Sequence, residues 1–303
     1  MSAHRVIGVD LGGTKILAGL VDREGNVLRR HERPTPTASQ AELLEGLAGA
    51  VDAVGRREVA AVGVGVPSTV DQRDGSAVAS VNIPLADVSL RSHFASRFDL
   101  PVGIENDANA AALAEWTFGA GRGTRHMVML TLGTGIGGGL ILDGRLYRGA
   151  VGAAAELGHI VIDHDGIPCQ GACTGRGHLE VLASGTAADA AATELYGPNG
   201  TSEQLVERAR GGETAAVAAL GGLARRLGSG IASFVNIFNP EIVVLGGGFA
   251  SVGELLFAPA REVVAREARP PSGETVRIVP AELGNEAGLV GAALVAFEAL
   301  DAA

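Results

Sequence analysis

The sequence predicts an α/β protein built from two related halves. Residues 6–22 and 128–144 share one pattern, in which an apolar run, a glycine-rich turn containing threonine and a second apolar run follow each other. Each stretch is typical of a strand, a turn and a returning strand. Because the two copies start about 120 residues apart, they indicate two α/β halves rather than a short-period solenoid. The length of 303 residues fits one very large domain or two ordinary ones.

The remaining segments alternate between helical and strand patterns. In the first half we expect helices at 42–54, 90–98 and 107–116, and strands at 59–66 and 102–104. In the second half we expect helices at 185–195, 202–209 and 215–238, strands at 241–245 and 276–279, and a closing helix at 287–300. The glycine-rich stretch 119–123 is the expected boundary. It divides the chain into an N-terminal lobe, 1–119, with residues 288–303 packed back on it, and a C-terminal lobe, 120–287.

Composition and charge limit the class of protein. With 47% hydrophobic residues the chain can bury a large core, and no apolar run is long enough to span a bilayer without charges or turn signals. The first residues lead directly into a strand without a cleavable signal peptide. We therefore expect a cytoplasmic protein without a membrane partner, whose cysteines are reduced and available to a metal. A net charge of −10 argues against nucleic acid as the main partner.

The chain has only two cysteines, and both lie close to two histidines. Cys169 and Cys173 stand between His159 and His178. Zinc favours four tetrahedral ligands, and thiolate and imidazole both suit it. Four protein ligands leave no open position, so we expect a structural zinc in the loop 159–178. Nearby glycines favour this interpretation because a tight ligand knuckle needs backbone freedom; the alternative is two unrelated cysteines in a loop.

The glycine-rich turns are candidate phosphate sites. Backbone N–H groups without side chains in the way can hold phosphate oxygens. Asp10, in the first turn, can hold Mg²⁺ through water. The alternative is that these are turn glycines without function, and a third turn at 246–248 weighs against it. Lys15 is as well explained by a solvated lysine as by a phosphate ligand. The expected nucleotide-binding residues are Asp10, Gly12, Gly13, Thr14, Lys15, Gly133, Thr134, Gly135, Gly137, Gly138, Gly246 and Gly247.

Polar side chains gather where the strand 102–104 meets the helix 107–116. Residues 105–109 read Glu-Asn-Asp-Ala-Asn. An N-cap role for Asp107 is one interpretation, but so dense a polar set exceeds what a cap requires. A carboxylate here can accept a proton from a substrate hydroxyl as it attacks phosphorus. Two further carboxylates, Glu156 and Glu180, flank the zinc ligands and are expected to be free to meet a substrate.

Taken in order over nearly the whole chain, these motifs resemble the ROK family of bacterial sugar kinases and sugar-responsive repressors. The resemblance implies the two-lobed actin-like ATPase fold, which is ribonuclease H-like, with Mg-ATP and a hexose in a cleft between the lobes. It implies that Asp107 is the general base and that His159 binds zinc through one ring nitrogen and sugar through the other. The implied sugar-binding residues are Asn82, Asn106, Asp107, Glu156, His159 and Glu180. A homo-oligomer, a dimer or a tetramer, is also expected.

Two departures from the family pattern affect these expectations. The family usually has Cys-x-Cys followed by a third cysteine, whereas here three residues separate Cys169 from Cys173 and His178 replaces the third cysteine. Two nitrogens and two sulfurs still complete a tetrahedron, so zinc remains the expected metal. Glucokinase-like members often continue Asn-Ile-Pro with Gly-Trp, whereas this chain has Leu85 and Ala86. That difference weakens any identification of the sugar.

The expected function is ATP-dependent phosphorylation of a hexose at its C6 hydroxyl, with glucose as the first candidate. The alternatives within the family are a kinase for mannose, fructose, allose or an N-acetylated amino sugar, and polyphosphate as the donor. An alternative of another class is a sugar-sensing regulator that binds without phosphorylating. The about nine residues before Asp10 are too few for a helix-turn-helix, and Asp107 is retained, so we expect the kinase.

Overall fold

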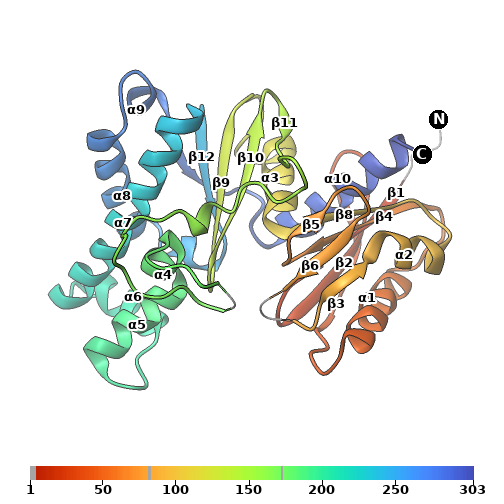
Figure 1. Ribbon diagram of the computed structural model, residues 1–303, viewed down its shortest axis with the longest axis horizontal. Helices are drawn as coiled ribbons and strands as arrows, with labels where there is room; N and C mark the ends of the chain where they lie inside the picture. Colours follow the sequence, from red (N-terminus) through yellow and green to blue (C-terminus); the bar gives the residue numbers. More distant parts are fainter. Residues whose placement is uncertain (1–4, 81–82, 172) are drawn as a thin grey trace. The chain divides into compact units, whose positions relative to one another are not determined.

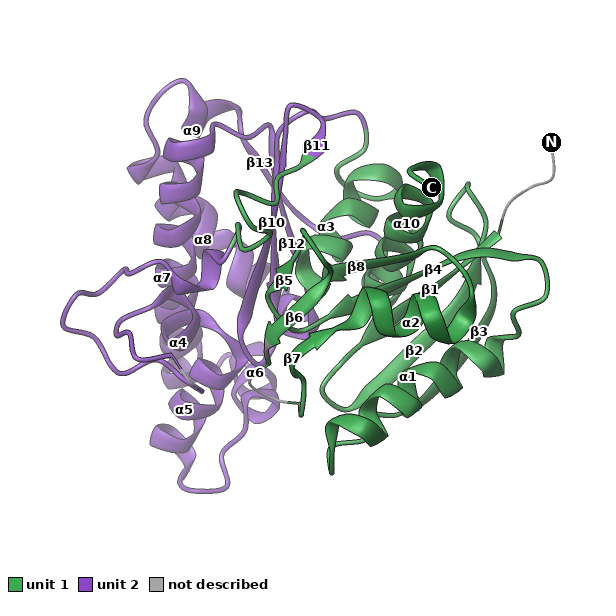
Figure 2. Cartoon of the chain, turned by 45° about the vertical axis from the view of Figure 1, so that its right-hand side comes forward, with its two compact units in different colours: residues 1–122, 146–155, 283–303 green, residues 123–145, 156–282 purple. Residues whose placement is uncertain are grey.

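The structure is a computed structural model that describes residues 5–80, 83–171 and 173–303; Asn82 lies outside these ranges. The chain forms two compact units (Figure 2). Unit 1 comprises residues 1–122, 146–155 and 283–303, and unit 2 comprises residues 123–145 and 156–282. Where the sequence suggested lobes divided at 119/120 and 287/288, the chain changes unit at 122/123 and 282/283, and it also returns to unit 1 for ten residues, 146–155.

Unit 1 is built on a five-stranded sheet (Figure 1). Its strands follow the order β3 (Val27–Pro34), β2 (Lys15–Val21), β1 (Arg5–Leu11), β4 (Val59–Val66) and β8 (Val102–Asn106). The β1–β2 and β2–β3 pairs are antiparallel, whereas β1, β4 and β8 run parallel. A small sheet of β5 (Val70–Asp71), β6 (Ser76–Ala79) and β7 (Ala86–Ser89) completes the unit.

The two faces of the unit 1 sheet differ because side chains alternate along each strand. One face presents large apolar residues, such as Ile7, Val64 and Ile104, which form a buried cluster with α1 (Gln40–Val54) and α2 (Leu90–Phe98). The other face presents small residues to α10 (Ala287–Asp301). Figure 2 shows α10 beside α3 (Asp107–Phe118).

A row of three glycines brings α10 into close contact with the sheet. Gly8, Gly63 and Gly103 lie side by side on β1, β4 and β8. A Cβ atom at any of them would overlap a backbone carbonyl of α10; at Gly63 it would meet the carbonyl oxygen of Ala292. Helix α10 meets α3 in the same way, since a Cβ at Gly291 would overlap the backbone of α3. These glycines therefore set the distance between sheet and helix.

Unit 2 repeats the architecture with a second five-stranded sheet. Its strands follow the order β11 (Arg145–Leu146), β10 (Ile136–Leu142), β9 (Met127–Leu132), β12 (Ile242–Gly246) and β13 (Arg277–Pro280). In unit 1, β1 pairs antiparallel with β2 and parallel with β4. In unit 2, β9 pairs in the same way with β10 and β12. The expectation of two related α/β halves is therefore confirmed.

Among the residues that the structure describes, six helices belong to unit 2, and three short 3₁₀ turns are also present. The helices are α4 (Leu179–Ala183), α5 (Gly185–Tyr196), α6 (Ser202–Arg210), α7 (Thr214–Phe238), α8 (Glu254–Glu267) and α9 (Ser272–Thr275). The 3₁₀ turns are η1 (Leu157–His159), η2 (Gly248–Val252) and η3 (Gly284–Glu286). Within the described ranges, no helix is both long and apolar enough to cross a bilayer.

Of the described elements without a counterpart among the sequence-based expectations, β3 and α8 are the longest. Strand β3 has a run of charged residues, and much of it is exposed at the edge of the sheet, so it lacks an apolar pattern. Helix α8 contains Pro259, which removes one helical hydrogen bond and interrupts the helical signal. Packing of its apolar side, which includes Leu256, Phe257 and Val263, maintains the helix despite the proline.

We predict that Gly63→Ala lowers the free energy of unfolding by about 3 kcal/mol, because the added methyl group overlaps a helix backbone that cannot move alone. The matched control is Gly222→Ala in α7, where an added Cβ meets no atom within 4 Å. That change should stabilise the protein by about 0.5–1 kcal/mol. Urea unfolding of both variants measures the difference. Equal stabilities would show that α10 does not depend on the glycine row.

Candidate functional site

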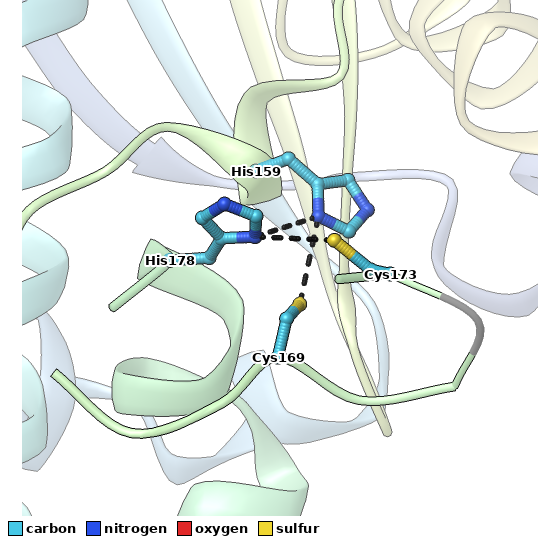
Figure 3. Close-up of side chains that lie close together, drawn as sticks. All are labelled: His159, Cys169, Cys173 and His178. Carbon is cyan, nitrogen blue, oxygen red and sulfur yellow. Dashed lines mark hydrogen bonds between the residues drawn. The ribbon is translucent and has the colours of Figure 1, made fainter. Parts of the chain in front are cut away.

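The four expected zinc ligands converge in unit 2 (Figure 3). Their ligand atoms all lie within 4.8 Å of one another. His159 ends the turn η1, and His178 is the N-cap residue of α4. Between them the loop folds back on itself through bridges between Val161 and His178 and between Pro168 and Arg176. The loop therefore brings both thiols close to the two imidazoles, as expected.

Three separations among these atoms are close to the edges of a tetrahedral zinc site. The two Nδ1 atoms lie 3.1 Å apart, and each is 3.7 Å from one sulfur: His159 from Cys169, and His178 from Cys173. Ligands at about 2.0–2.1 Å for nitrogen and about 2.3 Å for sulfur give tetrahedral edges of about 3.3–3.8 Å. The donor set of two nitrogens and two sulfurs is one that zinc accepts. Because both histidines turn Nδ1 toward the cluster, Nε2 of His159 remains for another partner.

Two local features of the loop bear on metal binding: one ligand needs a glycine beside it, and one thiol must release a proton. A Cβ at Gly175 would overlap the imidazole of His178, so glycine is needed beside this ligand. Burial, followed by the hydrogen bond to Cys173, raises the pKa of the Cys169 thiol to about 11. Without a metal this thiol keeps its proton at neutral pH, so coordination of a thiolate must release it.

Glu180 is engaged more than the sequence indicated. We expected this carboxylate to be free to meet a substrate, but its Oε2 accepts a hydrogen bond of 2.8 Å from the backbone N–H of Ile136. A Cβ at Gly135 would overlap the same oxygen. Glu180 therefore links the start of α4, next to His178, to the hairpin between β9 and β10. Glu156 precedes η1, and its side chain is exposed.

The turn between β9 and β10 contains three of the expected nucleotide-binding residues. Gly133 donates its N–H to the carbonyl of Gly135 at 2.9 Å, and its own carbonyl accepts from Gly185 at 2.8 Å. Thr186 donates its hydroxyl to the carbonyl of Thr134 at 2.7 Å, so the start of α5 holds this turn. A Cβ at Gly133 would meet no atom within 4 Å, which leaves open space beside its backbone.

The other expected glycines of unit 2 have different surroundings. Gly137 and Gly138 are strand residues of β10, paired with Thr131 and Leu130, and not part of the turn. Gly246 ends β12. Gly247 has φ of 84°, and a Cβ there would overlap the backbone of Leu132. The internal packing of unit 2 is thus enough to require glycine at 247.

A cavity of about 490 Å³ lies in unit 2 beside the turn between β9 and β10. Gly133 and Thr134 form part of its lining, together with residues from the first half of α5, from η2 and from one side of α6. The α6 residues are Ser202, Glu203, Val206, Glu207 and Arg210. These residues were not among those predicted from the sequence, although 203, 206, 207 and 210 have the spacing of one helical face. A mostly charged face of this kind is typical of a solvent-exposed helix surface, so the spacing alone did not reveal a cavity.

In unit 1, Asp10 lies at the end of β1 against α10. A Cβ at Gly288 would overlap its carboxylate. Burial raises the pKa of Asp10 to about 6, and the charge of Lys15 partly opposes this shift. The ammonium of Lys15 forms an exposed ion pair of 3.0 Å with Glu32. Residues 12–14 form the turn, in which Gly12 donates its N–H to the Lys15 carbonyl at 2.9 Å.

Asp107 is the first residue of α3, and the N-cap is Asn106. The interpretation of Asp107 as the N-cap is therefore wrong; Asn106 takes that role by accepting the N–H of Asn109 at 3.1 Å. Oδ1 of Asp107 accepts hydrogen bonds from the Asn106 side chain at 3.1 Å and from the N–H of Ala108 at 2.8 Å. These bonds fix the orientation of a half-buried carboxylate at the point where strand becomes helix.

The chain is similar in sequence and structure to known proteins. The sequence profile of the ROK family matches residues 6–299. A glucokinase from Streptomyces coelicolor is 39% identical to the chain, covering 96% of it and 97% of that protein. A glucokinase from Thermotoga maritima is 38% identical, with coverages of 98% and 99%. The crystal structure of a ROK family glucokinase from Streptomyces griseus in complex with glucose and AMPPNP matches with a TM-score of 0.84 and 37% identity, over 97% of this chain and 99% of that one.

We predict one zinc per chain in the purified protein, held by His159, Cys169, Cys173 and His178. Cys173→Ser and His178→Ala should each lose most of the metal, because an incomplete tetrahedron binds zinc weakly. The matched control is His164→Ala, an exposed histidine of the same loop that is not among the clustered ligands. Elemental analysis measures the content. A His178→Ala variant that retained a full equivalent of zinc would leave three protein ligands and contradict the assignment.

We also predict that Asp10→Asn stabilises the nucleotide-free protein at pH 8. A pKa of about 6 in the folded protein, against the ordinary 3.8, means that the ionised carboxylate is unfavourable in the folded state. This destabilisation is full above pH of about 6, absent below about 4, and worth about 2–3 kcal/mol.

Urea unfolding at pH 8 and pH 4.5 tests this prediction. The variant should exceed the wild type in unfolding free energy at pH 8, and the difference should shrink at pH 4.5. A difference of the same size at both pH values would rule out titration of Asp10 as its cause.

Proposed function

Because the chain belongs to the ROK family, we propose that it is an ATP-dependent hexose kinase that phosphorylates the C6 hydroxyl of glucose. Support comes from glucokinases that resemble the chain over nearly their full length. Within the structure, the observation that carries the proposal is Asp107, held in one orientation at the start of α3 by Asn106 and Ala108. A carboxylate fixed in this way suits proton transfer from a hydroxyl.

In the proposed reaction, Asp107 accepts the C6 proton while the hydroxyl oxygen attacks the γ-phosphorus of ATP and ADP leaves. Asn106, Asn82 and the unit 2 residues Glu156, His159 and Glu180 hold the other sugar hydroxyls. Among them, Glu180 has one carboxylate oxygen bonded to Ile136, so it offers the sugar mainly the other. His159 offers Nε2, and a zinc held at Nδ1 would keep the proton on Nε2.

The nucleotide is assigned to the glycine turns and the unit 2 cavity. The cavity of about 490 Å³ adjoins Gly133 and Thr134 and suits the nucleoside part of ATP. The open space beside Gly133 allows the backbone to approach phosphate oxygens. Mg²⁺ would lie near Asp10 and neutralise charge on the phosphates. A cytoplasmic location and assembly into a dimer or tetramer are proposed with this activity.

We predict that Asp107→Asn lowers kcat by at least about 100-fold, the usual contribution of a general base, because an amide cannot accept the proton. The melting temperature and the dissociation constant for glucose should change little. The matched control is Asp99→Asn, an exposed aspartate at the end of α2 in the same unit, which should keep wild-type kcat. A coupled ADP-release assay measures both variants. More than about a tenth of wild-type kcat in Asp107→Asn would contradict the base assignment.

The same assay across a panel of sugars tests the substrate. Glucose should give the highest kcat/KM with ATP, above mannose, fructose, allose and N-acetylated amino sugars. Polyphosphate in place of ATP tests the donor. A wild-type protein that binds glucose but releases no ADP with any sugar would be a regulator, and the kinase proposal would fail.

A further inference from the structure

Glu105 is a fully buried carboxylate next to the proposed catalytic residues. Its exposed fraction is 0%, and it lies in β8 on the side of the sheet that faces α10. A charge removed from water in this way is very unfavourable unless it is paired and hydrogen-bonded. Glu105 is not among the residues assigned to sugar, phosphate or metal, so its presence needs another explanation.

Arg148 pairs with this buried charge. Its Nε donates to Oε2 of Glu105 at 2.6 Å, and its Nη2 donates to Glu298 of α10 at 2.7 Å. Arg148 belongs to residues 146–155, the short return of the chain to unit 1. This segment is held in unit 1 by further contacts: Gln72 donates its N–H to the carbonyl of Val151 at 3.3 Å.

The other oxygen of Glu105 holds the start of α3. Oε1 accepts from the backbone N–H of Asn106 at 3.0 Å and from the side-chain Nδ2 of Asn109 at 3.1 Å. In an ordinary capping box, the side chain of the third helical residue would itself accept the N–H of the N-cap. Here Glu105 takes that N–H, and the third helical residue, Asn109, bonds to Glu105 instead.

Glu105 also determines which way the Asn109 amide is turned. Among the residues that the structure describes, Oδ1 of Asn109 has no hydrogen-bond partner. Turning the amide over would direct this oxygen at the Glu105 carboxylate, which repels it. The backbone N–H of Asn109 in turn holds Asn106, whose Nδ2 donates to Asp107.

We propose that Arg148 is a positioning residue for phosphoryl transfer. It pairs with Glu105 and holds its orientation, so that Glu105 fixes Asn106 and Asn109 and, through Asn106, the carboxylate of Asp107. The inference rests on the proposed function, since it assigns to Asp107 the role of base. It also explains the return of the chain to unit 1 at 146–155, because this segment places the guanidinium of Arg148 beside Glu105, on the face of the sheet toward α10.

The test compares Arg148→Met, Arg148→Lys, Glu105→Gln and the double variant Arg148→Met with Glu105→Gln. Arg148→Met should lower kcat by about 10- to 100-fold, the scale expected when a catalytic group is misplaced by a fraction of an ångström to 1 Å. It should raise the KM for glucose through Asn106, whereas the KM for ATP should stay within about two-fold because Arg148 and Glu105 bond to none of the residues proposed to bind ATP. Arg148→Lys should recover part of kcat, since it keeps the charge without the two-armed geometry.

The double variant separates positioning from a purely structural role. A neutral Glu105→Gln side chain can still accept the Asn106 N–H, so removing Arg148 from this background should cost at most about two- to three-fold in kcat. The matched control is Arg91→Met. Arg91 and Arg148 both line a cavity of about 670 Å³ in unit 1, but Arg91 donates to the Gln72 carbonyl. Its kcat should remain within about two-fold of the wild type.

Three results would overturn the inference. These are equal losses in Arg148→Met and Arg91→Met, additive losses in the double variant, and a lower kcat with both KM values unchanged, which indicates only a smaller folded fraction. If Arg148→Met fails to fold, Arg148→Lys and Glu298→Gln give the same comparison with smaller changes. A wild type that binds glucose without turnover would overturn the proposed function alone.

Discussion

Close contact between α10 and the glycine row of β1, β4 and β8 is the constraint on which the rest of unit 1 depends. Three neighbouring strands lack a side chain at the same level, and the carbonyl groups of α10 occupy that space. The helix meets α3 just as closely at Gly291. Since α3 begins at Asp107, the position of the proposed base follows from packing on the far side of the sheet from α1 and α2. A larger residue in the row would displace α10, and α3 with it.

The same side of the sheet holds a fully buried carboxylate, Glu105, and a partly buried one, Asp10, which differ in their partners. Glu105 is bonded to Arg148 and to two groups at the start of α3, so its charge is compensated. For Asp10, the charge of Lys15 opposes the effect of burial only in part, and the pKa rises to about 6. A structural carboxylate needs such compensation, whereas one that is to meet Mg²⁺ gains from its absence, because the incoming cation supplies the missing charge. The contrast agrees with the different roles proposed for the two residues.

Local patterns in the sequence predicted the zinc ligands, the two glycine hairpins and the helix that begins at Asp107. Each depends on residues close in sequence or on a residue type with one strong preference, such as the cysteines 169 and 173. Other features could not be predicted from local patterns. The hydrogen bond between Glu180 and Ile136 and the ion pair between Glu105 and Arg148 join residues that are 44 and 43 positions apart. The return at 146–155 depends on how the chain divides into units. Strand β3 was missed because an exposed edge needs no apolar pattern, and α8 because tertiary packing outweighs the effect of one proline.

The place of α10 in the chain order bears on how the protein folds while it is made. All five strands of the unit 1 sheet are complete once residue 106 has left the ribosome, but the helix that covers the glycine row is made after every other described element. The strands of unit 2 end at Pro280, before α10 begins. Unit 2 can therefore close while the nascent unit 1 still exposes one side of its sheet. For this protein the first unit to begin is the last to be finished, which reverses the usual order of folding from the N-terminus.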